Sequence, residues 1–246
     1  MSYKGRLVTD MKTQWEQVYD AMEANGGFAT FNQLNQILDF SSWKTKTPEA
    51  SVRGIVQTHK EFSKLKPGLW CLSKYKNILE KEMGFVKKDG SIDEERNHAY
   101  YQGIIIEIGN LNKKDTYIPP QDKNKKFLNN KLGDITTIEQ IYDFTTYKSI
   151  LNRAKTVDVI WFNERQMPDA FYEVEHTTDI CNSLDKFYEL QDFYATFNIV
   201  ANKSRFKEFS SKIERSIYLP IRNRVKFVEY EKLANQYSAA LVPRVI

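Results

Sequence analysis

The chain has 246 residues, of which 41% are hydrophobic and 28% are charged, and its formal net charge at pH 7 is +4. This length accommodates one large domain or two small ones, and the composition is that of an ordinary soluble globular protein. No stretch approaches the roughly 18 consecutive apolar residues of a membrane span, and residues 1–12 lack the apolar core of a signal peptide, so we expect a cytoplasmic protein without a membrane partner. The two cysteines, Cys71 and Cys181, lack the spacing of a structural zinc site or a disulfide framework.

The first block of the chain begins with the signals of two helices. Apolar residues recur at helical spacing after residue 12, and Gly26-Gly27 ends that periodicity. A short strand, Phe28 to Thr30, then precedes a second helix, Phe31 to Leu38.

A third helix and a hairpin complete this block. Thr47 is a typical N-cap residue, and Pro48 suits the first helical position. Two alternating segments, Phe62–Lys66 and Leu69–Leu72, flank Pro67-Gly68 and predict a β-hairpin.

Three helices followed by a hairpin predict a winged helix, whose third helix enters the DNA major groove while the hairpin contacts the backbone. The expected DNA contacts are polar and basic residues around the third helix and the hairpin: Lys46, Thr47, Ser51, Arg53, Gln57, Lys60, Lys64 and Lys66. If the helix reads bases, Arg53 would contact guanine and Gln57 adenine. A solvated helix face has the same composition, so a winged helix that binds only proteins is the alternative.

Three runs in this block resemble the HARE-HTH domain, a winged helix found in chromatin proteins and bacterial restriction endonucleases. They are Phe28–Leu34, Thr47–Arg53 and Lys66–Trp70. The resemblance covers roughly the first 75 residues, and it implies a DNA-recognition domain over residues 1–80.

Lys87 to Ser91 indicates a boundary, and we place the second domain at residues 91–246. It begins with a helix from about Ser91 to Gly109, followed by a polar segment, Asp115 to Asp134, that predicts a long functional or mobile loop. The later expected elements are a helix from Leu184 to Tyr194, strands Asn198–Ala201 and Val225–Glu229, and a helix from Tyr230 to Ala240. The strand–helix–strand order from Glu173 through the first of these helices to Asn198–Ala201 predicts that those two strands run parallel.

The most informative stretch contains two strand-like runs, Val157–Phe162 and Ala170–His176. If they form a hairpin centred near Gln166, Asp158 falls opposite residue 174. A slip of one residue places it across from Glu173 or Glu175, which share one strand face.

Three converging carboxylates are costly unless a cation neutralises them, and oxygen ligands suit Mg²⁺ or Mn²⁺. The alternative is that Glu173 and Glu175 form the solvent face of an edge strand.

Asp158 followed by Glu173-Val174-Glu175 resembles the active-site pattern of PD-(D/E)XK nucleases. The surrounding residues are similar to a bacterial restriction-type subgroup, and the resemblance covers roughly Arg96 to Tyr218. It implies that Asp158 and Glu173 hold the metal. Glu175 stands where most members have lysine, and it would act there as a ligand or general base.

The resemblance leaves the source of the usual positive charge open, with Lys186 and Lys203 as candidates. It also makes Glu107 a candidate metal ligand, the alternative being a plain surface glutamate. Gln191 is a candidate for lining the site. Strand alternation points His176 to the opposite face from the acids, which favours a core or hydrogen-bonding role.

Together these features predict an α/β (α+β) protein in which a winged helix precedes a PD-(D/E)XK-like mixed sheet flanked by helices. The function we expect is that of a sequence-specific, type II-like restriction endonuclease that hydrolyses double-stranded DNA with Mg²⁺, or with Mn²⁺ in its place. We expect a homodimer in a bacterial or archaeal cytoplasm, alongside a separate cognate methyltransferase. The alternatives are a modification-dependent endonuclease that senses methylcytosine, a catalytically silent DNA-binding protein, and a winged-helix transcription regulator with an α/β effector domain.

Overall fold

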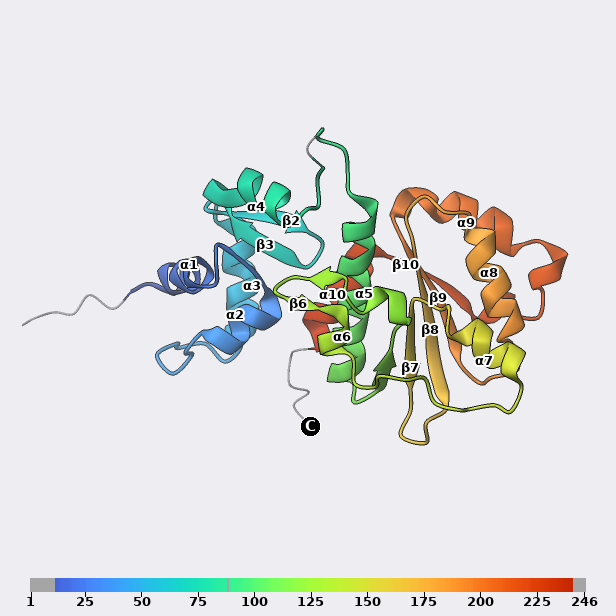
Figure 1. Ribbon diagram of the computed structural model, residues 1–246. Coiled ribbons are helices and arrows are strands. Elements are labelled where there is room, and N and C mark those ends of the chain that lie inside the picture. The colour runs from blue at the N-terminus through green and yellow to red at the C-terminus, as the bar shows by residue number, and fades with distance from the viewer. Residues whose placement is uncertain (1–11, 88, 241–246) are drawn as a thin grey trace, which may run out of the picture. The chain divides into compact units, whose positions relative to one another are not determined.

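A computed structural model describes residues 12–87 and 89–240, and its fold mixes helices and sheets, as Figure 1 shows. The predicted α/β fold class is confirmed. The chain divides into two compact units, Met1–Leu79 and Glu80–Ile246. None of the described helices combines the length and the apolar character that crossing a membrane requires.

The first unit contains a three-stranded antiparallel sheet in the order β1-β3-β2. Its elements are α1 (Gln14–Ala24), β1 (Phe28–Thr30), α2 (Phe31–Ile37), α3 (Pro48–Thr58), β2 (Phe62–Lys66), β3 (Leu69–Leu72) and the start of α4 (Lys76–Glu82). The three helices, the short strand and the hairpin predicted here are confirmed to within a residue or two at their ends.

Local signals at the helix starts explain part of this agreement. The Thr30 hydroxyl accepts from the Gln33 N–H at 3.3 Å while the Gln33 side chain accepts from the Thr30 N–H at 2.9 Å, so α2 begins with a capping box. Thr47 occupies the N-cap position of α3 as predicted, but at φ −134° and ψ 70° its side chain makes no capping bond. Pro48 does begin α3 as predicted.

The second unit is built on a five-stranded mixed sheet in the order β10-β9-β8-β7-β4. The strands are β4 (Asp115–Tyr117), β7 (Val159–Phe162), β8 (Pro168–Glu175), β9 (Thr196–Ala201) and β10 (Val225–Glu229). Strands β8 and β9 run parallel, as predicted, and β10 also runs parallel to β9. Strands β7 and β4 complete the sheet with antiparallel pairings. A separate two-stranded ribbon joins β5 (Lys126–Phe127) to β6 (Asn130–Lys131).

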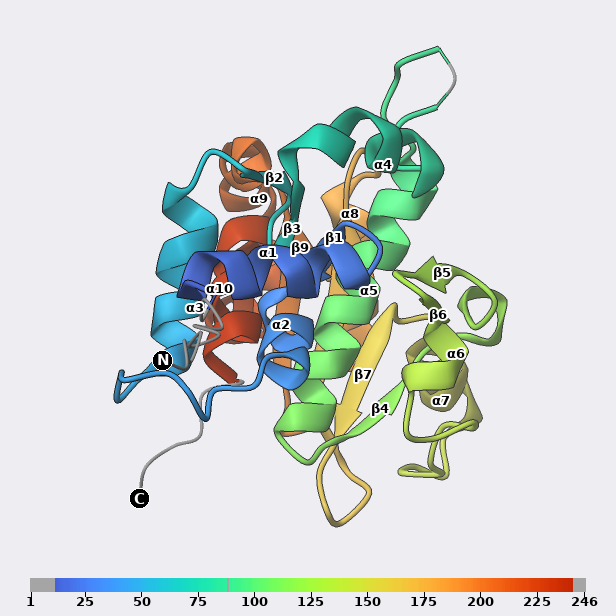
Figure 2. The same ribbon diagram turned by 90° about the vertical axis from the view of Figure 1, so that its left-hand side faces the viewer.

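Helices cover both faces of this sheet (Figures 1 and 2). One face carries α5 (Glu94–Leu111) and α10 (Tyr230–Ala240), and the other carries α7 (Lys148–Ala154), α8 (Ile180–Glu189) and α9 (Phe206–Ile213); the short α6 (Leu132–Ile135) lies beside α5. Under α8, the ring of Phe197 stacks on those of Phe171 and Phe187 at centroid distances of 5.6 and 5.0 Å. Each of these buried rings contributes about 1.5–3 kcal/mol of hydrophobic stabilisation.

One prediction and one alternative for this unit are wrong. The segment Asp115–Asp134 is not a structureless loop, because β4 pairs with β7 and the ribbon and part of α6 follow. Glu173 and Glu175 do not face solvent on an edge strand, because β8 lies between β7 and β9 and these two residues are only 3% and 4% exposed.

Candidate active site

Asp158 directly precedes β7, and its carboxylate is fixed from two sides. Val159 pairs with Tyr172, so of the registers considered, the one that slips by a residue and puts Asp158 beside Glu173 is confirmed. The Val174 N–H donates to Asp158 Oδ2 at 2.8 Å, and His98 Nε2 of α5 lies 3.3 Å from the same oxygen. The Asp158 side chain keeps 14% of its surface exposed.

Glu173 lies on the face of β8 that α8 covers, and a lysine of α8 pairs with it. Lys186 Nζ donates to both Glu173 carboxylate oxygens at 2.9 Å and to the Thr156 carbonyl at 2.9 Å. The Ser183 hydroxyl donates to Glu173 Oε2 at 3.2 Å. Of the two lysines considered, the structure therefore brings Lys186 to the carboxylates.

Glu175, two residues further along the same face, has its own set of donors. The hydroxyls of Ser183 and Thr178 donate to its carboxylate. Arg205 Nη1 lies 3.5 Å from Glu175 Oε2. Ser183 thus links Glu173 and Glu175, and the two acids are held by separate cations.

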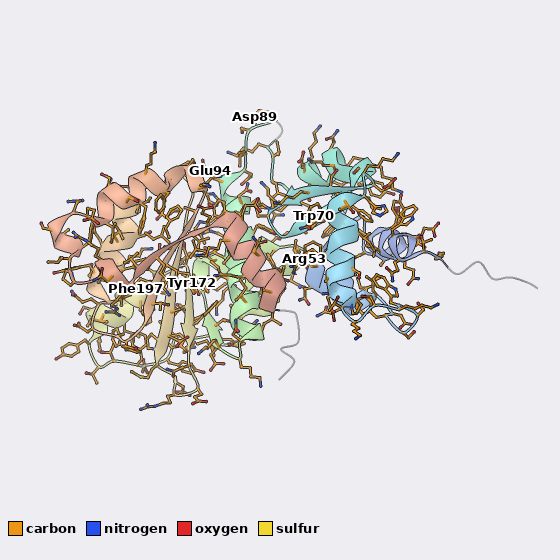
Figure 3. The ribbon with its side chains drawn as sticks, turned by 180° about the vertical axis from the view of Figure 1, so that it is seen from behind. Arg53, Trp70, Asp89, Glu94, Tyr172 and Phe197 are labelled. Carbon is orange, nitrogen blue, oxygen red and sulfur yellow. The ribbon has the colours of Figure 1, made fainter. Side chains whose placement is uncertain are left out.

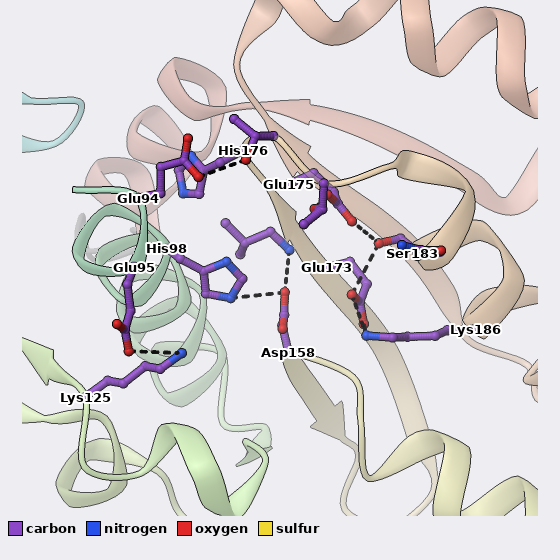
Figure 4. A pocket seen from close by; sticks show the side chains of 14 residues that line it. Glu94, Glu95, His98, Lys125, Asp158, Glu173, Glu175, His176, Ser183 and Lys186 are labelled. Carbon is purple, nitrogen blue, oxygen red and sulfur yellow. Dashed lines mark hydrogen bonds and ion pairs between the residues drawn. The ribbon is translucent and has the colours of Figure 1, made fainter. Parts of the chain in front are cut away.

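These side chains face one cavity of about 510 Å³, shown in Figure 4. It is lined by Glu94, Glu95, His98, Lys125, Asp158, Glu173, Val174, Glu175, His176, Thr177, Thr178, Asn182, Ser183 and Lys186. Five of these residues are acids and two are lysines. A cavity with this excess of carboxylates favours a bound cation.

The surroundings of the acids lower the pKa of Asp158 and raise the pKa values of Glu173 and Glu175. Burial raises the pKa of Glu173 well above its usual range, and the nearby Asp158 carboxylate adds to this despite Lys186. Burial also pushes the pKa of Asp158 upward, but His98, the Val174 N–H and Lys186 outweigh it, so the pKa of Asp158 is lowered. Burial raises the pKa of Glu175 against the hydrogen bonds from Ser183 and Thr178. Asp158 is therefore held ionised while Glu173 tends to take up a proton.

The residues at this cavity fit a divalent metal ion. Asp158 and Glu173 offer buried carboxylate oxygens, the ligand type that Mg²⁺ prefers. The Lys186 ammonium bound by both Glu173 oxygens shows that this position attracts a cation.

Two other candidate residues lie elsewhere. Glu107 of α5 accepts a hydrogen bond from the Tyr237 hydroxyl of α10 and does not line the cavity, so the structure does not bring it to Asp158 and Glu173. Gln191 lines a different cavity of about 490 Å³. His176 is among the residues that line the acidic cavity, and its Nδ1 lies 2.8 Å from the Tyr230 hydroxyl, in agreement with the expected hydrogen-bonding role.

The predicted DNA contacts lie in the first unit. Lys46, Thr47, Gln57, Lys60 and Lys64 are exposed, and Ser51, Arg53 and Lys66 are half-buried. Arg53, labelled in Figure 3, projects from α3 with its guanidinium 5.6 Å from the centre of the Phe31 ring.

Sequence reasoning missed three residues around Asp158. His98 approaches from α5, and Asp122 and Lys125 come from the segment expected to be a loop. One ligand atom from each of His98, Asp122 and Asp158 lies within 4.8 Å of the others. Their wide separation along the chain left no local signal.

Comparisons with known proteins place these observations in a family. Residues 80–242 match the family described as "Type II restriction enzyme NmeDI C-terminal domain". The Type II restriction enzyme NmeDI of Neisseria meningitidis serogroup C is 27% identical to this chain over 105 residues, which are 41% of this chain and 30% of that protein. The similarity thus spans less than a third of the relative's length. No solved structure matches the chain.

Proposed function

The chain belongs to the type II restriction enzyme NmeDI C-terminal domain family, and from this premise we propose that it is a sequence-specific endonuclease that hydrolyses double-stranded DNA with Mg²⁺. The observation that carries the proposal is the carboxylate cluster of Asp158, Glu173 and Glu175 on two paired strands, facing one cavity with Lys186. The order of these acids, with a central β8 between an antiparallel and a parallel neighbour, supports a PD-(D/E)XK-like nuclease domain.

Asp158 and Glu173 would hold the metal ion, which supplies neutralisation of phosphate charge and activation of water when bound. Asp158 is prepared for this role because His98 and the Val174 N–H keep it ionised. Glu173 would lose its proton on metal binding, because a divalent cation would stabilise the ionised carboxylate more strongly than the Lys186 ammonium does.

Lys186 and Glu175 would supply the remaining chemistry. The Lys186 ammonium, released from Glu173, would stabilise negative charge on the phosphate, the role usually assigned to a lysine on the strand itself. Glu175 has a raised pKa and lies at the same cavity, which suits a residue that accepts a proton from the attacking water. The donors Ser183 and Thr178 fix its orientation.

The first unit would recognise the DNA as a winged helix of the HARE-HTH type. Its three helices and its β2–β3 hairpin follow the order that this assignment requires. With α3 in the major groove, Arg53 would contact guanine and Gln57 adenine. Replacing either residue by alanine should relax specificity at one base pair, as selection from a random DNA library would reveal. An equal loss of binding to all sequences would contradict base reading.

Cleaving both strands requires two active sites or two visits, and a homodimer meets this requirement most simply. A separate methyltransferase would protect the host DNA.

A plasmid cleavage assay tests the catalytic proposal. The protein is incubated with Mg²⁺ and with methylated or unmethylated DNA, beside Asp158→Ala and Glu173→Ala. The matched control is Glu189→Ala, which removes a half-exposed acid of α8 paired with Arg153. We expect discrete fragments from the parent and the control and none from the two cavity variants.

Other results would replace the proposal. Cleavage of methylated DNA alone would indicate a modification-dependent enzyme. Tight duplex binding without any cleavage would indicate a silent nuclease domain, and fragments that persist in Asp158→Ala would refute the assigned site.

A further inference from the structure

A second group of ligand-type side chains lies on the α5 side of Asp158, away from Glu173. His98, Asp122 and Asp158 each offer a ligand atom, and these atoms lie within 4.8 Å of one another. The Asp122 side chain is 6% exposed, that of Asp158 14% and that of His98 23%. An imidazole and two largely buried carboxylates on three separate elements therefore converge.

The side-chain amide of Gln102 is hydrogen-bonded to two members of this group. Gln102 is fully buried on α5, and its Nε2 donates to Asp122 Oδ2 at 2.8 Å and to the Asp158 carbonyl at 3.3 Å. These two bonds fix the orientation of the amide. Its Oε1 is buried and has no hydrogen-bond partner among the described residues. A buried acceptor without a donor is costly, so this amide is held in place by its two Nε2 bonds to Asp122 and to the Asp158 carbonyl.

We propose that His98, Asp122 and Asp158 form a second divalent-cation site, selective for a first-row transition metal such as Mn²⁺ over Mg²⁺. Imidazole nitrogen is a good ligand for transition metals, whereas Mg²⁺ prefers oxygen and retains its water. The inference deepens the proposed function and rests on it for its catalytic meaning, because Asp158 would serve both this cation and the proposed catalytic Mg²⁺.

The surrounding charges can rearrange to admit the cation. Lys125 Nζ lies 2.7 Å from Asp122 Oδ1, and the same nitrogen is already 3.9 Å from Glu95 Oε1. Glu95 is largely exposed at 73%, so it can accept Lys125 when a metal takes over Asp122. His98 and Lys125 line the same cavity as Asp158, which gives a cation a route from solvent.

The first test counts bound metal ions by titration calorimetry with Mn²⁺ alone, on the full chain without DNA. We expect two Mn²⁺ per parent chain. His98→Ala and Asp122→Asn should each weaken one of them at least about 10-fold, the loss that even outer-shell changes produce. Glu173→Gln should weaken the other one, and Asp158→Asn should weaken both. His59→Ala, which removes a half-exposed histidine of the first unit, is the matched control and should change neither.

The second test observes the imidazole directly and needs no variant. The chain has three histidines, so labelling them with ¹⁵N gives a small set of ring signals. Added Zn²⁺, a diamagnetic first-row dication, should shift the Nε2 signal of His98 and leave that of His59 in place. Excess Mg²⁺ should not reproduce this shift.

The outcomes separate this inference from the proposed function. A single Mn²⁺ that His98→Ala leaves unchanged, or a His98 signal that ignores Zn²⁺, would overturn the second site even if the protein cuts DNA. Two Mn²⁺ with the expected response, in a protein that cuts no DNA, would uphold the site and remove the nuclease proposal.

Discussion

Replacing Lys186 by methionine removes the ammonium group while keeping an unbranched stem. Breaking a buried ion pair typically costs 3–5 kcal/mol, but Lys186 is 21% exposed and Glu173 can take up a proton, so we expect a loss of about 2 kcal/mol without metal. For a unit of this size, that corresponds to a Tm lowered by roughly 4–8 °C. Saturating Mg²⁺ should shrink the deficit, because a metal ion neutralises the same carboxylates.

Lys186→Met should also lose DNA cleavage, and saturating Mg²⁺ should not restore that loss. Removing one preorganised charge stabiliser typically lowers kcat by about 10²–10³-fold. Single-turnover cleavage of plasmid DNA in saturating Mg²⁺ measures this step, and thermal unfolding in EDTA and in Mg²⁺ measures the stability. Lys203→Met, which changes an exposed lysine two residues after β9, is the control and should keep the parent's stability and single-turnover rate. A Lys186→Met protein that cuts within twofold of the parent rate would refute the catalytic role and leave Lys186 a structural counter-ion.

Two further predictions concern a buried acid and two helical glycines. The raised pKa of Glu173 means that the folded, metal-free chain binds more protons than the unfolded chain above the usual glutamate pKa, so its stability falls as pH rises through that window. Glu173→Gln should therefore gain Tm relative to the parent between pH 5 and pH 8 in EDTA, and parallel curves would contradict the shift. A Cβ added to Gly103 would lie 2.1 Å from the buried Phe127 ring, so Gly103→Ala should lower the free energy of unfolding by about 1–3 kcal/mol. Gly54→Ala in α3 meets nothing within 4 Å and should raise it by about 0.5–1 kcal/mol; urea unfolding measures both, and equal signs would refute the packing argument.

Elements with short-range signals could be predicted from the sequence. Thr30 and Gln33 cap α2 over three residues, and Pro67-Gly68 joins β2 to β3. The strand β4 could not be predicted, because its three residues become a strand only by pairing with β7 more than 40 positions later. Pairing with a strand that lies so far along the chain leaves no pattern in the local sequence from which β4 could be predicted.

The same distinction divides the candidate site. Asp158 and Glu173 could be placed together because a hairpin joins their strands, although the turn left the register open by one residue. Lys186 could be suggested but not placed, since its position depends on how α8 packs on β8. His98 and Asp122 were missed because helix α5 and the segment after β4 meet Asp158 only in the folded chain.

The division of the chain at residue 80 has an evolutionary consequence. Both units are formed by uninterrupted stretches of sequence, and the family match begins where the second unit begins. A single recombination at that joint would exchange the first unit whole and cut no strand of the five-stranded sheet. If the first unit reads DNA as proposed, a lineage could acquire a new target sequence in one genetic event while the catalytic residues pass on intact.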